Sequence, residues 1–187
     1  YEWYRESAIG NPDVKWETVT KMNVGLDYNL FKGLIAGSVE VFKDDRTDIL
    51  VSGGERSVPG YFGGTPPTVN LGRVRATGYE LELRVNKQFR NSLRLWGNFN
   101  MTHAENVILK KDDPELLPNY QKQAGYAIGQ YRSHIDAGFL NTWDEVYGSP
   151  AHETNDAQSL PGDYHIVDFD GNGVIDSKDS APYGFTG

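Results

Sequence analysis

Four stretches of the chain alternate apolar and polar residues, which is the period-two pattern of a β-strand with two different faces. In residues 18–30 the alternation becomes strict at Lys21. From there to Leu30 every even position is apolar and every odd position is polar or glycine. The apolar positions are Met22, Val24, Leu26, Tyr28 and Leu30. The alternation returns less regularly over residues 34–43, and then over 79–86 and 93–102. The pattern predicts an all-β chain, and no stretch has a convincing helical period.

The connections between these stretches alternate between short and long. Residues 31–33 and the segment around Phe89-Arg90-Asn91 are the size of hairpin turns, which predicts antiparallel pairing. Residues 44–68 and the chain after residue 108 form much longer connections. One end of the sheet is therefore predicted to carry short turns and the other end long loops, as in bacterial outer-membrane barrels.

The stretches are also long for strands of a soluble protein, which average ~5–6 residues, and they suit a tilted membrane strand of ~9–11 residues. Aromatic residues near their ends are candidates for girdles at the membrane surface. These residues are Trp16, Tyr28, Phe31, Phe42 and Phe89. A soluble antiparallel sheet with one buried face has the same alternation. The rhythm of short and long connections favours part of a large transmembrane β-barrel over that alternative.

Composition excludes several classes of function. The 187 residues include no cysteine, which excludes disulfides, thiolate zinc sites, iron–sulfur clusters and cysteine nucleophiles. The formal charge of −8 argues against nucleic acid as a partner, because phosphate binding requires clustered lysine and arginine. No run approaches the ~20 apolar residues of a transmembrane helix. The chain begins at Tyr1 without an initiator methionine or signal peptide, so we expect an internal piece of a longer protein.

Negative charge is concentrated in the second half of the chain. Residues 112–180 contain thirteen acidic and three basic residues. Within this region, residues 168–179 have the register of an EF-hand-like loop, in which alternate oxygen ligands curl around a calcium ion. The predicted ligands are Asp168, Asp170, Asn172, the backbone carbonyl of Val174, Asp176 and Asp179.

Two details of this loop define the kind of site that it predicts. Gly173 stands at position 6, where the chain must turn sharply, and Asp179 replaces the bidentate glutamate of sensor EF-hands at position 12. The arrangement resembles the dockerin-type variant. Because no helical pattern flanks the loop, we expect a structural Ca²⁺ site rather than a conformational sensor.

Other candidate chemistry is weak. The four histidines are scattered and no phosphate-binding glycine loop or nucleophile motif is present, so we predict no catalytic residues and no enzyme. A glycosidase would need a pair of carboxylates in a supporting context. Aromatic residues of the acidic region either stack on sugar rings or pack the loop on itself, and we favour packing. These weak candidates for substrate binding are Tyr126, Tyr131, Trp143 and Tyr147.

Residues 11–18 read Asn-Pro-Asp-Val-Lys-Trp-Glu-Thr and are followed at residues 20–27 by Thr-Lys-Met-Asn-Val-Gly-Leu-Asp. This pair of blocks resembles the SusC/RagA-like TonB-linked outer-membrane transporters, and it is the most specific part of the resemblance. Further blocks match in the family's order at residues 42–50, 70–80, 125–129 and 161–163. Ala76 and Ala127 depart from the asparagine and proline that are usual there.

The resemblance implies an antiparallel transmembrane barrel of about 22 strands with an N-terminal plug, of which this chain would supply about four strands. Residues 1–108 would hold these strands, with short periplasmic turns and one long outer loop at 44–68. Residues 109–187 would form a long extracellular loop region that includes the EF-hand-like calcium loop at 168–179.

The resemblance also implies a function, which is the TonB-energised import of oligosaccharides, or in some branches of peptides, across the bacterial outer membrane. The expected partners are a SusD-like surface lipoprotein, outer-membrane lipid, the transported substrate, and TonB through a part of the protein absent from this chain. The alternative is a soluble, secreted β-rich module that binds calcium and carbohydrate.

Overall fold

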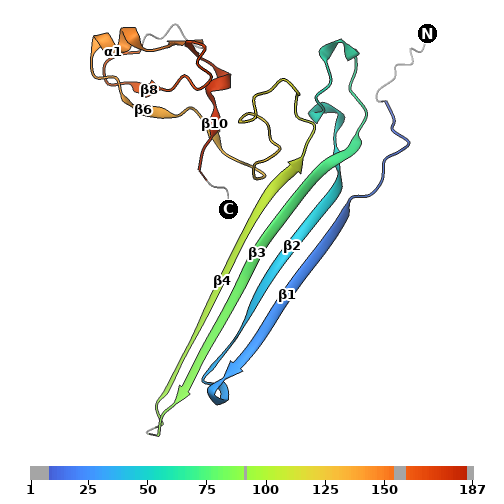
Figure 1. Ribbon diagram of the computed structural model, residues 1–187, viewed down its shortest axis with the longest axis vertical. Helices are drawn as coiled ribbons and strands as arrows, with labels where there is room; N and C mark the ends of the chain where they lie inside the picture. The colour runs from blue at the N-terminus through green and yellow to red at the C-terminus, as the bar shows by residue number, and fades with distance from the viewer. Residues whose placement is uncertain (1–8, 91, 154–158, 185–187) are drawn as a thin grey trace, which may run out of the picture. The chain divides into compact units, whose positions relative to one another are not determined.

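The computed structural model describes residues 9–90, 92–153 and 159–184 (Figure 1). Asn91 of the second predicted turn lies outside these residues. The chain divides into two compact units. The described residues of unit 1 lie within 9–114 and Gln123–Ile128, and those of unit 2 lie within Glu115–Lys122 and 129–184.

Unit 1 is built on one antiparallel sheet with the strand order β1-β2-β3-β4 (Figure 1). Its strands are β1 (Thr18–Leu30), β2 (Ile35–Val51), β3 (Val69–Gln88) and β4 (Arg94–Lys110). The 3₁₀ helix η1 (Phe31–Gly33) joins β1 to β2, and a short turn joins β3 to β4. The prediction of an all-β, antiparallel sheet of four strands is confirmed.

Strands β2, β3 and β4 are longer than the hydrophobic pattern predicts. Because β2 continues to Val51, its connection to β3 covers residues 52–68 rather than 44–68. This connection contains the 3₁₀ helices η2 (Gly53–Glu55) and η3 (Gly60–Phe62). The alternation is lost before Val51 because β2 has a bulge around Asp48, whose backbone is left-handed with φ of 58°. One extra residue in a strand moves the following side chains to the opposite face.

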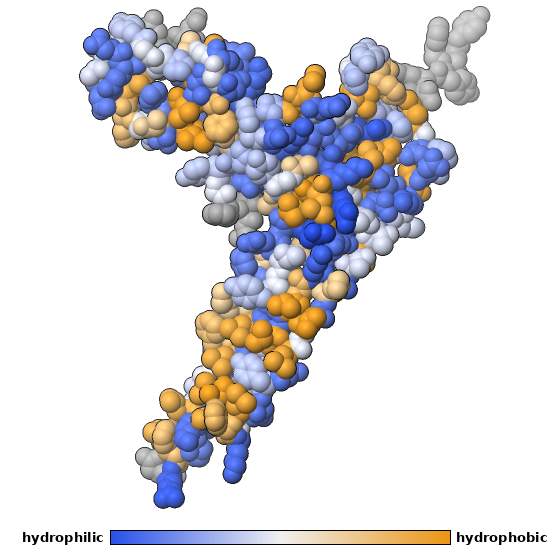
Figure 2. Space-filling model, in the orientation of Figure 1, coloured by the Kyte–Doolittle hydropathy of each residue, from blue (hydrophilic) through white to orange (hydrophobic). Residues whose placement is uncertain are grey.

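The register of the sheet gathers apolar side chains of all four strands on one face, because directly paired residues share a face. One row across the sheet consists of Leu26, Val39, Leu81 and Met101. We call the rows from Val24 to Leu30 of β1, with their partners on β2–β4, the aliphatic band. Figure 2 shows apolar residues gathered along the lower half of the strands.

The aliphatic band is exposed rather than packed in a core. The exposed fraction is 70% for Val24 and 67% for Leu26. A soluble sandwich would bury such a face against a second sheet. The exposure of large aliphatic side chains on strands of 13 to 20 residues therefore favours lipid as the surroundings of this face.

Two aromatic rings cover glycines of the neighbouring strand, one on each face of the sheet. Tyr28 lies opposite Gly37, and its hydroxyl donates to the backbone carbonyl of Glu82 at 3.0 Å. Phe42 covers Gly78 on the other face. A Cβ at Gly37 would lie 2.7 Å from the Tyr28 hydroxyl. Glycine is required at these positions because each ring occupies the space of a side chain.

Unit 2 consists of short elements joined by turns. Strand β5 (Arg132–Ser133) pairs with β10 (Ala181–Pro182), β6 (Asp136–Phe139) pairs with β8 (Tyr164–Ile166), and β7 (Ala151–His152) pairs in parallel with β9 (Val174–Ile175). The helix α1 (Trp143–Gly148) and the 3₁₀ helix η4 (Ser177–Asp179) complete it. Its buried apolar residues are Leu140, Ile175 and Ala181.

Helix α1 is not predicted by the hydrophobic pattern, because six residues are too few for a helical period. Its signal is a local one. Thr142 Oγ1 accepts a hydrogen bond from the Glu145 N–H at 3.2 Å, and the Glu145 carboxylate accepts one from the Asn141 N–H at 2.6 Å. This Thr-x-x-Glu spacing is that of a capping box. Among the described residues, no helix combines the length and the apolar character needed to cross a membrane.

We expect Gly37→Ala to lower the free energy of unfolding of the full-length protein by about 1–3 kcal/mol, because the new methyl group overlaps the Tyr28 hydroxyl and the Glu82 carbonyl. Gly97→Ala is the matched control, since nothing lies within 4 Å of a Cβ at that position on the same face. Denaturant unfolding in lipid vesicles measures both variants. Equal stabilities of the two would contradict the close contact at Gly37.

Candidate functional site

Three of the six predicted metal ligands come together in unit 2. Carboxylate oxygens of Asp168, Asp170 and Asp179 all lie within 4.8 Å of one another. Asp179 is fully buried, Asp168 is half-buried and Asp170 is exposed. The acidic cluster formed by these three residues is therefore closed on one side and open to solvent on the other.

The carboxylate of Asp168 organises the first half of the loop. Its Oδ1 accepts hydrogen bonds from the backbone N–H groups of Gly171 at 2.7 Å and Asn172 at 3.1 Å, and its Oδ2 accepts one from Gly173 at 2.6 Å. Gly171 and Gly173 have φ angles of 74° and 86°, a region that favours glycine. The predicted sharp turn at Gly173 is thus confirmed.

Asp179 closes the loop from its other end. Its Oδ1 accepts hydrogen bonds from the N–H groups of Phe169 at 2.7 Å and Asp170 at 3.3 Å, and its Oδ2 accepts one from Asp176 at 2.7 Å. Burial raises the pKa of the Asp179 carboxyl, but these three donors and nearby His134 outweigh burial, so its pKa lies below the ordinary value. The buried group is therefore an anion at neutral pH.

The other predicted ligands lie beside the acidic cluster. The Asn172 side chain donates to Asp170 Oδ2 at 3.1 Å and accepts from the Val174 N–H at 2.7 Å. Asp176 caps η4 by accepting from the Lys178 N–H at 2.6 Å, and its carboxylate is 3.7 Å from the Lys178 ammonium. Asp176 is not among the three residues whose oxygens converge. Position 9 of such a loop often reaches its ion through a water molecule.

Tyr120 ties a distant segment of unit 2 to the loop. Its hydroxyl donates to the Lys178 carbonyl at 2.8 Å, and its ring contacts that of Phe169 edge-on with centroids 4.7 Å apart. Burial raises the pKa of the Tyr120 hydroxyl, and the negative charges of Asp170, Asp179 and Asp176 raise it further. The sequence does not predict this contact, which joins residues 58 positions apart.

The acidic cluster has the chemistry of a site for a hard divalent cation. In the described part of the chain, Asp168, Asp170 and Asp179 form no ion pair with lysine or arginine. Three converging carboxylates repel one another unless a cation lies between them. Their oxygens, with the amide oxygen of Asn172, are the ligand type that Ca²⁺ prefers.

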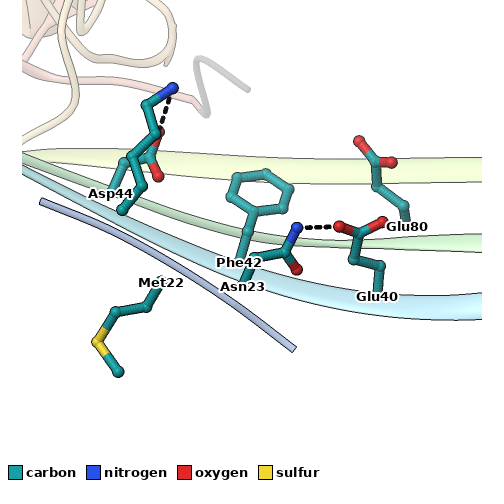
Figure 3. A pocket seen from close by; sticks show the side chains of 7 residues that line it. Met22, Asn23, Glu40, Phe42, Asp44 and Glu80 are labelled. Atoms are coloured by element: carbon teal, nitrogen blue, oxygen red, sulfur yellow. Dashed lines mark hydrogen bonds and ion pairs between the residues drawn. The ribbon is translucent and has the colours of Figure 1, made fainter. Parts of the chain in front are cut away.

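A second candidate surface lies on the polar face of the sheet in unit 1. Figure 3 shows Asn23, Glu40, Phe42 and Glu80 on this side and Met22 pointing away from it. Glu40 and Glu80 are directly paired across β2 and β3, and the Asn23 amide donates to Glu40. These side chains line an open hollow of about 310 Å³. Directly paired carboxylates repel each other, and water weakens this repulsion, so the pair suits a surface that meets water or polar solutes.

The four aromatic candidates for substrate binding do not form one group. Tyr126 belongs to unit 1, where its backbone carbonyl accepts from the Ile108 N–H, whereas the other three belong to unit 2. Trp143 and Tyr147 stack with centroids 6.0 Å apart and remain 51% and 79% exposed. Tyr131 is also exposed.

Sequence reasoning missed a second stacked pair in unit 2. Phe139 of β6 and Tyr164 of β8 lie with ring centroids 5.0 Å apart, and both are more than half exposed. These rings meet because Phe139 and Tyr164 are paired across two short strands. No period-two pattern announces strands of three or four residues.

Comparison with known proteins decides the family. The family model for "TonB dependent receptor-like, beta-barrel" matches residues 2–175. This chain belongs to that family. TonB-dependent receptors are outer-membrane proteins that transport and are not enzymes. The family assignment supports the predicted barrel and outer-membrane location against the alternative of a soluble, secreted module.

Individual TonB-dependent receptors align with most of the chain. Receptor P3 of Formosa agariphila is 28% identical over 91% of this chain, and receptor SusC of Bacteroides thetaiotaomicron is 28% identical over 98% of it. Receptor P39 of Formosa agariphila is 30% identical over 73% of it. The chain spans 18% of the length of P3 and of SusC, and 13% of P39.

Two solved structures resemble this chain in fold. The RagAB peptide importer in its closed-closed state matches with a TM-score of 0.58 at 17% identity, over 95% of this chain and 19% of that one. A second structure of the RagAB peptide transporter matches with a TM-score of 0.52 at 18% identity, over 74% of this chain and 17% of that one. Together with the family model, this likeness of fold identifies the four-stranded sheet as part of a TonB-dependent receptor barrel.

The hydrogen bonds of Asp179 predict a structural role that does not require metal. In the full-length receptor kept in chelator, Asp179→Ala leaves three backbone N–H groups without their acceptor and should speed proteolysis within residues 115–184 at least about tenfold. Asp170→Ala is the control, because among the described residues that exposed carboxylate accepts hydrogen bonds from Asn172 alone. Limited proteolysis followed by mass spectrometry compares the two, and equal cleavage would contradict this role.

Proposed function

We propose that this chain is part of the barrel wall of an active importer that takes oligosaccharides, or peptides, across the bacterial outer membrane. The observation that carries the proposal is the two-faced sheet, in which a TonB-dependent receptor chain exposes an aliphatic band on one face and polar side chains on the other. A transport barrel needs both faces, one against lipid and one against an aqueous interior.

The polar face offers hydrogen-bonding groups to the interior of the barrel. Arg84 is bound to Glu82 by two hydrogen bonds of 2.7 and 3.0 Å, and Arg94 donates to the Asn86 amide oxygen at 2.9 Å. Glu80, Glu82, Arg84, Arg94 and Asn98 share this face by their register. In the proposed importer these groups line the path of a polar substrate or meet the plug.

Partners of the importer follow from its relatives. Similarity to SusC and to the RagAB transporter supports a SusD-like surface lipoprotein on the outer face of the barrel. TonB would deliver energy through a region outside the fifth of the relatives' length that this chain spans. Oligosaccharides are the first substrate class because the resemblance of the sequence to SusC/RagA-like transporters implies them. Peptides are the second class because the RagAB importer, which this chain resembles in fold, is a peptide importer.

Uptake in the bacterium that carries the gene tests the import function. Deleting the full-length gene should abolish accumulation of a labelled oligosaccharide, or of a labelled peptide, and the same loss should follow from disrupting TonB. Complementation with the intact gene should restore accumulation. Unchanged uptake of both substrate classes in the deletion strain would reject the importer.

We propose further that the acidic loop holds Ca²⁺ with Asp168, Asp170, Asn172, the Val174 carbonyl, Asp176 and Asp179 as its ligands, directly or through water. The bound ion would remove the repulsion among the converging carboxylates. Because Tyr120 bonds to Lys178 and packs on Phe169, stiffening the loop would also hold the segment around Tyr120. The site would then shape an extracellular loop for the lipoprotein or the substrate.

Asp170→Asn should weaken Ca²⁺ binding of the full-length receptor about tenfold or more, because it removes one charged oxygen ligand. Asp144→Asn, in the first turn of α1 and outside the acidic cluster, is the control and should leave affinity unchanged. Isothermal titration with CaCl₂ measures both. Absence of Ca²⁺ binding by the wild type at millimolar CaCl₂ would reject the metal site without affecting the importer.

A further inference from the structure

Four basic residues gather on the lipid side of the sheet, directly beyond the aliphatic band. This basic patch consists of Lys43, Arg73, Arg75 and Lys110. Lys43 lies two residues beyond Val41 on β2, so it projects to the same face as the aliphatic side chains. The patch therefore belongs to the outward face of the barrel wall.

The pairing register brings the members of the patch together. Lys43 is paired with Thr77, Arg75 with Asp45, and Arg73 with Lys110. Thr77, Arg75 and Arg73 follow one another at alternate positions of β3, which places the four cations within three successive rows. At ~3.4 Å per residue and a strand tilt of ~45°, three rows cover roughly 10 Å of depth.

The basic patch has a net positive charge even when the carboxylates on the same face are included. Asp45 accepts from Arg75 Nε at 2.7 Å and lies 3.6 Å from the Lys43 ammonium. Arg73 and Lys110 are exposed, and neither forms an ion pair within the described residues. The Glu105 carboxylate, on the same face, lies 3.1 Å from Nε2 of His103. Four cations against two carboxylates leave an excess of positive charge in a chain whose total charge is −8.

Basic residues at the same level of the sheet but on its polar face are paired differently with carboxylates. Lys21 lies 3.6 Å from Asp44, and Arg46 lies 3.3 Å from Glu17. Each of these two basic side chains has a carboxylate of its own, so the interior side carries no comparable excess. The asymmetry between the two faces points to an anion on the lipid side.

We propose that the basic patch binds the phosphate groups of lipid headgroups in the outer leaflet of the outer membrane. Guanidinium and ammonium groups are the side chains that bind phosphate best. The patch begins where the aliphatic band ends, and its depth of roughly 10 Å is enough to span the headgroup layer of ~5–7 Å that borders a ~30 Å hydrocarbon core. It lies at the end of the sheet with the long β2–β3 connection, which is the outer end in such barrels.

The proposal rests on the outer-membrane location of the family and not on transport, so it stands or falls separately from the importer. The test uses the full-length receptor in a non-ionic detergent, titrated with diphosphoryl lipid A and, in parallel, with lipid A whose phosphates have been removed. Native mass spectrometry counts the bound lipid. We expect the wild type to bind the phosphorylated form at least about tenfold more tightly, with an affinity that falls between 50 and 500 mM NaCl.

The double variant Arg73→Gln/Lys110→Gln should bind diphosphoryl lipid A about tenfold to thirtyfold more weakly, because each cation near a phosphate-bearing surface contributes about a factor of five. Lys21→Gln/Arg46→Gln, at the same height on the polar face, is the matched control and should bind like the wild type. The heat-dependent gel shift of the folded barrel shows that both variants have folded. The salt dependence of the wild type tests the proposal even where a variant fails to fold.

Three results would overturn the proposal. Equal binding of both forms of lipid A would mean that only the acyl chains are recognised. Unchanged affinity of the outward double variant would place the phosphate elsewhere. Displacement of the lipid by inorganic phosphate at equal concentration would mean that the patch binds a free anion rather than a headgroup.

Discussion

The constraint behind this structure is that a backbone inside a lipid bilayer has no water to satisfy its N–H and C=O groups. Strands meet that constraint only by pairing along their whole length, and the alternation of side chains then gives each strand one face for lipid and one for water. The exposed aliphatic side chains of β1–β4, the polar groups opposite them and the short turns at one end all follow from this requirement. The aromatic rings over Gly37 and Gly78 are consistent with it, because they fill the positions where the chain supplies no side chain.

The sequence predicts the part of the sheet that lies within the bilayer better than the part beyond it. β1 is observed at Thr18–Leu30, the stretch that alternates most strictly. β2 and β3 extend further than predicted because beyond the aliphatic band neither face keeps one character. In β2, residues 44–48 are polar on both faces and residues 49–51 are apolar on both, and the bulge around Asp48 reverses the order of the faces. A hydrophobic pattern can mark only the segment in which one face differs from the other.

The acidic loop is predictable in register but not in its supporting contacts. Alternate oxygen ligands around Gly173 identify Asp168, Asp170 and Asp179 as residues that come together. The burial of Asp179 beneath three backbone donors and the contact of Tyr120 with Lys178 depend on chain segments that are far apart in the sequence. The pair of Phe139 and Tyr164 is hidden for the same reason, since it depends on the pairing of two very short strands.

The two outer strands of the sheet have a consequence for biogenesis. In the described sheet, β1 pairs only with β2 and β4 only with β3. The outer edges of both strands therefore offer backbone N–H and C=O groups to further strands, except at Ile108, which bonds to Gly125 and Tyr126. Unpaired edge strands readily form hydrogen bonds with other extended chains. In a barrel, neighbouring hairpins cover such edges by pairing with them, and until they do so the edges are the part of this sheet most exposed to pairing with foreign chains.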